Sequence, residues 1–122
     1  MTNADESVID SETLQGLREL AGDDTSFLPQ MIDLYLKTAT EKFPVLEAHL
    51  SSGRLKEVAS ICHQLKSSSG NLGALTLGKY FEAVEMSALG GNAGGAAAEF
   101  AKAKGEFPRV EAALKKLRNP VA

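Results

Sequence analysis

Apolar residues recur at every third or fourth position along almost the whole chain. This spacing places them on one face of an α-helix, and the strict alternation that marks a half-buried strand is absent. The pattern therefore predicts an all-α fold. We expect four long amphipathic helices joined by short turns, which favours an antiparallel four-helix bundle of up-down-up-down topology with a short N-terminal helix.

A short first helix is predicted to begin after Asp10 or Ser11. Either side chain can accept hydrogen bonds from the free amides of the first helical turn. The apolar face of this helix should bury three leucines: Leu14, Leu17 and Leu20. Gly22 and the two aspartates that follow it are expected to end the helix.

The second helix is predicted to start near Ser26 and to continue to about Leu50. Pro44 interrupts its apolar stripe and should bend the helix, because proline removes one backbone hydrogen bond and crowds the preceding turn. Residues 51–53 form a turn into a third helix. That helix carries the sequence at residues 62–74 that bears on function.

Glycine and proline make the last part of the chain less regular. A fourth helix is predicted over residues 75–89, and the segment 90–95, with four glycines in six residues, favours a flexible turn. The last helix should cover residues 96–117. Gly105 and Pro108 lie inside it and predict a kink or a brief break.

The length of 122 residues fits one domain, residues 1–122 with a core at about 8–118, and is too short for two ordinary domains. Hydrophobic residues make up 43% and charged residues 24%, which is typical of a soluble globular protein. The net charge of -3 and the lack of a basic cluster argue against nucleic acid as a partner. No apolar run approaches the roughly 20 residues of a membrane span, and no signal-peptide pattern opens the chain. We therefore expect a cytoplasmic protein without a membrane partner.

The candidate chemistry centres on His63, one of two histidines. Helical geometry places it about 120° from the centre of the apolar face of the third helix, at the edge of the buried stripe and partly in water. Apart from Lys66, its neighbours on the helix surface have small side chains: Ala59, Ser60, Ser67 and Gly70. These surroundings leave the imidazole unshielded and leave room for the backbone of another protein.

An imidazole in such a place can accept a phosphoryl group. Its unperturbed pKa of about 6.5 leaves much of it neutral and nucleophilic at neutral pH. Lys66, one turn further on, would disfavour protonation of His63 and then pair with phosphoryl oxygens, and Ser67 and Ser69 could donate hydroxyl hydrogen bonds. The chain has no nucleotide-binding loop and no acidic cluster for magnesium. The phosphoryl donor and most of the catalytic apparatus must therefore belong to another protein.

Simpler interpretations of the same residues stay open at this point. A histidine followed by a lysine three residues later is by itself typical of a solvated helix face. Adjacent helical residues diverge by about 100°, so Cys62 is better explained as a small core residue than as a thiol nucleophile activated by His63. The serines at 67–69 also fit the frayed end of a helix.

Metal binding is the weakest interpretation. His49 and His63 could supply half of a site across the bundle, but one or two histidines rarely suffice, and no cluster of further ligands accompanies them. Glu82 and Glu85 are expected to form a solvated face. We therefore predict no metal ion and no cofactor bound by this chain.

Residues 62–74, Cys-His-Gln-Leu-Lys-Ser-Ser-Ser-Gly-Asn-Leu-Gly-Ala, carry a family resemblance. The stretch resembles the signature of the histidine-containing phosphotransfer (HPt) domains of multistep phosphorelays, which reads approximately A-H-x-L-K-[GS]-S-[SA]-x-x-[LI]-G-A. Cys62 replaces the usual alanine, and Ser67 is a frequent alternative to glycine, so both positions keep small side chains. The resemblance covers nearly the whole chain.

The resemblance implies a four-helix bundle in which His63 accepts a phosphoryl group from the phospho-aspartate of a receiver domain and passes it to another response regulator. It implies that Lys66 contacts the phosphoryl group, that Gln64 and Ser67 lie beside the site, and that Gly70 keeps the surface open for docking. The chain would be a monomeric phosphocarrier and not an enzyme. Its partners would be response-regulator receiver domains and a hybrid histidine kinase, and the receiver would supply the magnesium and the acidic pocket.

Two other functions compete with this hypothesis. A four-helix binding module could dock a receiver or a histidine kinase without accepting phosphate, and its affinity would then not change in His63→Gln. An enzyme with a metal in the bundle core would retain stoichiometric metal through purification. The phosphocarrier is ranked first because the signature and the missing nucleotide apparatus both favour it.

Overall fold

The computed structural model describes residues 8–118, and the regular structure in this part of the chain is α-helical. Its helices are α2 (Ser11–Ala21), α3 (Phe27–Ser51), α4 (Leu55–Asn71), α5 (Leu75–Leu89) and α6 (Ala93–Arg118). None of the helices within residues 8–118 is long and apolar enough to span a membrane. The prediction of an all-α fold with a short N-terminal helix is confirmed.

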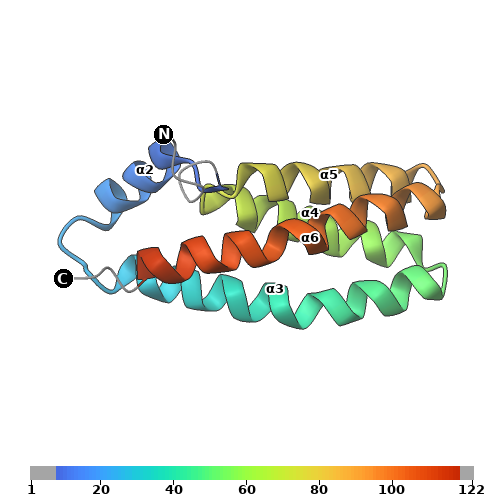
Figure 1. Cartoon of the computed structure of the whole chain (residues 1–122), viewed down its shortest axis with the longest axis horizontal. Coiled ribbons are helices and arrows are strands. Elements are labelled where there is room, and N and C mark those ends of the chain that lie inside the picture. Colours follow the sequence, from blue (N-terminus) through green and yellow to red (C-terminus); the bar gives the residue numbers. More distant parts are fainter. Residues whose placement is uncertain (1–7, 119–122) are drawn as a thin grey trace.

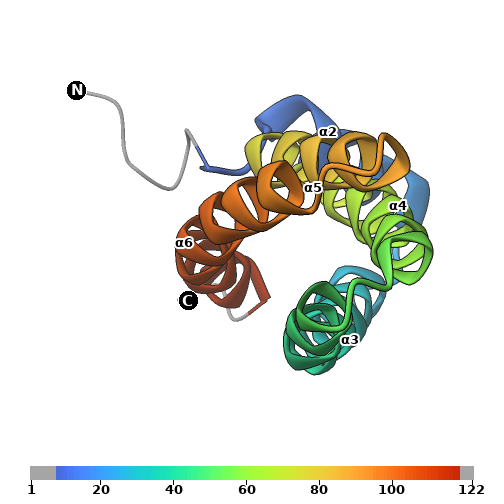
Figure 2. The same cartoon turned by 90° about the vertical axis from the view of Figure 1, so that its right-hand side faces the viewer.

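The long helices form an antiparallel bundle. Figure 1 shows α3, α4, α5 and α6 reversing direction at each turn, with α2 at one end of the bundle. Viewed along the bundle, they follow one another around the core in sequence order (Figure 2). α4 packs most extensively against α5, and α6 contacts both α5 and α3. The predicted up-down-up-down topology is therefore confirmed.

A cluster of phenylalanines holds α3, α5 and α6 together. The ring centroid of Phe43 lies 6.1 Å from that of Phe81, 5.6 Å from that of Phe100 and 4.9 Å from that of Phe107. These separations suit the offset and tilted contacts that aromatic rings prefer. Buried apolar residues from all five helices surround the cluster and form one continuous core.

The ends of α2 follow the predicted signals. The Asp10 carboxylate accepts a hydrogen bond from the Thr13 amide (3.0 Å) and another from the Thr13 hydroxyl (2.6 Å). These bonds favour the charged form and lower the pKa of Asp10. Gly22, with a φ of 60°, ends the helix and donates its N–H to the last turn.

The prediction that α2 buries three leucines is wrong for one of them. Leu14 is buried and Leu17 is partly buried, but Leu20 is 76% exposed. Leu14 and Leu20 lie about 120° apart around the helix axis. Because α2 packs against the bundle along one narrow face, it can cover only one of these two positions.

The start of α6 also corrects the sequence prediction. α6 begins at Ala93 instead of residue 96, so the second half of the glycine-rich segment is helical. The Asn92 side chain caps it by accepting a hydrogen bond from the Gly95 N–H (2.9 Å). A Cβ at Gly95 would lie 2.5 Å from the Asn92 amide nitrogen, so glycine here leaves room for the cap.

α3 and α6 continue through their internal prolines. α3 is unbroken at Pro44 and is bowed along its length in Figure 1. α6 is also unbroken at Gly105 and Pro108, so of the predicted kink or brief break, the break is wrong. The neighbouring Phe107 and Val110 are buried in the core, and this packing outweighs the local cost of the proline.

The turn between α4 and α5 is bound to the segment that precedes α2. The Asp10 N–H donates to the Gly73 carbonyl (2.8 Å). Gly73 has a φ of +85°, and a Cβ at this position would lie 3.0 Å from the Asp10 carbonyl oxygen. Both the left-handed backbone and the close contact therefore require glycine.

Substitution of Gly73 should destabilise the bundle more than substitution of a glycine that has a positive φ but no close contact. We expect Gly73→Ala to lower the free energy of unfolding by about 2–4 kcal/mol, because backbone strain and a backbone clash act together. Gly53→Ala is the matched control, since Gly53 has a φ of +70° and open space around its Cβ position. It should cost about 1–2 kcal/mol in the same urea titration. Equal losses in the two variants would show that the contact with Asp10 contributes nothing.

Candidate functional site

His63 lies midway along α4 and faces outward. Its side chain is 62% exposed, as the helical geometry predicted. It borders a shallow surface pocket of about 360 Å³ between α4 and α5, which is lined by Lys56, Ala59, Ser60, His63, Gln64, Glu85 and Leu89. A molecule that approaches this pocket therefore meets the imidazole directly.

Glu85 of α5 holds the imidazole ring. Its Oε2 atom lies 2.9 Å from Nδ1 of His63, and its side chain is only 14% exposed. A carboxylate accepts hydrogen bonds, so in the neutral ring it selects the tautomer that carries its proton on Nδ1. The lone pair then resides on Nε2, the other ring nitrogen. The prediction that Glu85 belongs to a solvated face is wrong.

Lys66 has a carboxylate partner of its own. Its Nζ atom lies 3.0 Å from Oε2 of Glu82, with the two side chains 36% and 54% exposed. Glu82 is exposed as predicted, but it is an ion-pair partner and not only a solvated residue. The lysine that was expected to support His63 is therefore bound to α5 in this structure.

The other residues predicted to surround His63 lie in different environments. The Ser67 hydroxyl donates to the His63 carbonyl (3.2 Å) within the helix. Ser69 is fully buried and shares a 2.6 Å hydrogen bond with the Tyr35 hydroxyl, so the prediction that it could donate to a phosphoryl group is wrong. Gln64 is exposed beside His63. Within the described part of the chain, no atom outside the local helix backbone lies within 4 Å of a Cβ built at Gly70, so the surface there is open.

Cys62 is a core residue, as predicted. It is fully buried, and burial together with the charge of Glu85 raises the pKa of its thiol to about 12. The thiol therefore stays protonated at neutral pH and cannot act as a nucleophile beside His63. Within residues 8–118, no group of three or more histidine, cysteine, aspartate or glutamate side chains could hold a metal ion.

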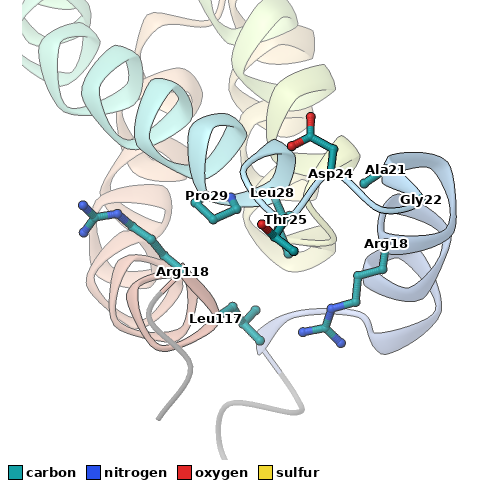
Figure 3. Close-up of a pocket in the computed structure, with 9 residues that line it drawn as sticks. All are labelled: Arg18, Ala21, Gly22, Asp24, Thr25, Leu28, Pro29, Leu117 and Arg118. Atoms are coloured by element: carbon teal, nitrogen blue, oxygen red, sulfur yellow. The ribbon is translucent and has the colours of Figure 1, made fainter. Parts of the chain in front are cut away.

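A second pocket, of about 330 Å³, lies where α2, the start of α3 and the end of α6 meet. Figure 3 shows the Arg18 side chain extending from α2 toward Leu117, whereas Arg118 points away from the pocket. Arg118 instead pairs with Asp33 of α3 at 2.6 Å. His63 does not line this pocket, so the predicted site makes no use of it.

The partners of His63 and Lys66 were missed because they lie on another helix. Glu85 is 22 residues from His63, and only the register of two packed helices brings them together. The sequence contains one usable signal. Glu82 and Glu85 share the three-residue spacing of His63 and Lys66, in the reverse order that antiparallel helices require.

Comparison with known proteins finds a matching family model and solved structures with a similar fold. The Hpt domain family model matches residues 30–120. The crystal structure of histidine-containing phosphotransfer protein B from Pseudomonas aeruginosa superposes with a TM-score of 0.85 at 26% identity, covering 94% of this chain and 97% of that one. A histidine-containing phosphotransfer protein from maize gives a TM-score of 0.83 at 23% identity, with 91% and 83% coverage, and supports the fold alone. Comparison with curated protein sequences gives no match.

The hydrogen bond to Glu85 should fix the tautomer of His63. At a pH where the ring is neutral, we expect nitrogen NMR to show a protonated Nδ1 and an unprotonated Nε2. Glu85→Ala should move the ring toward the opposite tautomer, which free imidazole side chains prefer in water. His49 serves as the internal reference, because its signals should not change. An unprotonated Nδ1 in the unsubstituted protein would contradict the assignment.

Proposed function

The chain belongs to the Hpt domain family, and we propose that it is a phosphorelay intermediate whose His63 accepts a phosphoryl group from the phospho-aspartate of a receiver domain and passes it to another response regulator. A role in phosphotransfer follows from the family itself. The observation that carries the residue-level proposal is the exposed His63 ring, held through Nδ1 by Glu85, while no hydrogen bond joins Nε2 to another side chain of residues 8–118. This arrangement is what a phosphoryl acceptor in a complex requires.

In the proposed transfer, the lone pair of Nε2 attacks the phosphorus of the aspartyl phosphate. The N–P bond forms as the bond between phosphorus and the aspartate oxygen breaks, and the aspartate leaves as a carboxylate. Nδ1 keeps its proton, so the ring becomes positively charged while the phosphoryl group carries two negative charges. The Glu85 carboxylate, 2.9 Å from Nδ1, would stabilise the charge that develops on the ring.

The residues around His63 would assist the transfer, but they would not supply the whole active site. Lys66, one turn away on the same helix, would pair with the phosphoryl oxygens, and Gln64 and Ser67 would border the docked partner. The open surface at Gly70 supports close approach of that partner. The receiver would supply the magnesium and the acidic pocket. We therefore propose a phosphocarrier that is not an enzyme by itself.

The proposal extends to partners and setting. The partners would be response-regulator receiver domains and a hybrid histidine kinase. The carrier would act as a monomer, since a second copy on this face would cover His63, and it would work in the cytoplasm, where ATP-derived phosphoryl groups are made. It would comprise a single domain over residues 1–122, with the core at about 8–118.

Phosphotransfer provides the direct test. Incubation with phosphorylated receiver domains from the same organism should place an acid-labile, base-stable phosphate on His63, and His63→Gln should abolish labelling. His49→Gln is the matched control and should label normally. Receiver binding without labelling, and with an affinity unchanged in His63→Gln, would favour the non-phosphorylated binding module. Undiminished labelling of His63→Gln would reject the proposal outright.

Gly70 allows folding and docking to be separated. Gly70→Ala should raise the free energy of unfolding by about 0.5–1 kcal/mol, because alanine favours the helix and, among residues 8–118, no atom outside the local helix backbone lies within 4 Å of its Cβ position. The same methyl group should slow transfer from a receiver, because it projects into the space that the partner would occupy. Urea titration and transfer rates measure the two effects. Faster or unchanged transfer in the more stable variant would show that Gly70 lies outside the docking surface.

A further inference from the structure

Two carboxylates of α5 face two nitrogen-bearing side chains of α4. Glu85 lies 2.9 Å from Nδ1 of His63, and Glu82 lies 3.0 Å from Nζ of Lys66. Each pair of residues is separated by three positions in its own helix, and the antiparallel course of α4 and α5 makes the two spacings match. The site therefore contains a hydrogen-bonded pair, His63 with Glu85, and an ion pair, Lys66 with Glu82, one helical turn apart.

The two pairs differ in how firmly they are held. The Glu85 side chain is 14% exposed, whereas those of Glu82 and Lys66 are 54% and 36% exposed. An exposed ion pair is weak and its partners exchange readily. A lysine ammonium has three donors on a flexible stem, so it can leave a carboxylate for a stronger anion nearby.

We propose that Glu82 is a positioning residue that competes with the phosphoryl group for Lys66. This inference rests on the proposed function. Before transfer, Lys66 pairs with Glu82. Once Nε2 of His63 carries a phosphoryl group with two negative charges, Lys66 exchanges to the phosphoryl oxygens, because side chains three positions apart on a helix are neighbours, with about 5–6 Å between their Cβ atoms. When the phosphoryl group leaves, Lys66 returns to Glu82.

This exchange would limit how strongly the site stabilises the phosphoryl group on His63. A lysine without another partner would stabilise phosphohistidine fully, and the group would then be harder to release. Glu82 offsets part of that stabilisation by offering Lys66 an alternative, and its own negative charge repels the phosphoryl group in the same direction. Because exposed ion pairs contribute little, the effect should be about twofold to fivefold.

The lifetime of phosphohistidine tests the competition without requiring a cognate partner. Phosphoramidate, a small-molecule phosphoryl donor, would label the purified protein, and phosphorus NMR would follow the loss of phosphate from His63. We expect Glu82→Gln to lengthen the half-life about twofold to fivefold. In a Lys66→Ala background, the same substitution should have less than half of that effect. Glu99→Gln is the matched control, because it removes the carboxylate of another exposed pair, with Lys102 at 3.1 Å on α6.

Each outcome of this experiment supports or rejects the competition between Glu82 and the phosphoryl group for Lys66. An unchanged or shortened half-life in Glu82→Gln, or an equal change with and without Lys66, would overturn the competition. So would a failure of phosphoramidate to label His63. A lengthened half-life that depends on Lys66, combined with no transfer from any receiver of the organism, would support the competition and reject the relay. Added salt should reduce the effect of Glu82→Gln, which a purely structural role of Glu82 would not predict.

Discussion

The close packing of α5 against α4 is the constraint on which the rest of the site depends. Gly78 of α5 lies where a Cβ would be 3.5 Å from the Lys66 carbonyl oxygen and 3.9 Å from the Gly70 amide nitrogen. A side chain larger than methyl would push the helices apart at this point. The packing sets both the separation and the register of the two helices. It therefore sets which carboxylates reach His63 and Lys66.

The same segment of α4 serves the core on one side and the site on the other. Cys62, Leu65 and Ser69 are buried, and the Tyr35 hydroxyl ties Ser69 to α3. Burial raises the pKa of Tyr35 to about 12. The phenol therefore stays neutral and keeps its hydrogen bond to Ser69 over the whole physiological pH range. His63 lies on the opposite, exposed face of α4. The buried residues and the bond to Tyr35 hold this helix in place against the core. Rigid support of this kind keeps a reactive side chain in position without burying it.

Features that depend on a single helix could be predicted from the sequence, and features that depend on two helices could not. The exposure of His63 and the burial of Cys62 follow from angles around one axis. Glu85 was assigned to the solvent because nothing within α5 indicates that α4 covers it. Ser69 was predicted to face the site for a related reason. Its neighbours in sequence are polar, and its buried partner Tyr35 lies on α3. The start of α6 was missed because the Asn92 cap outweighs the flexibility that glycines confer.

The two α5 carboxylates would act on phosphohistidine in opposite directions. Glu85 would accept a hydrogen bond from Nδ1–H and so favour the positive ring that forms when Nε2 is phosphorylated. Glu82 would draw Lys66 away from the phosphoryl oxygens and so disfavour the phosphorylated state. A carrier that receives a group and then gives it up needs such a balance, because strong stabilisation of the intermediate slows the second transfer as much as it favours the first. The antiparallel register places both influences beside one exposed ring, and the reacting aspartate and its metal would remain with the partner.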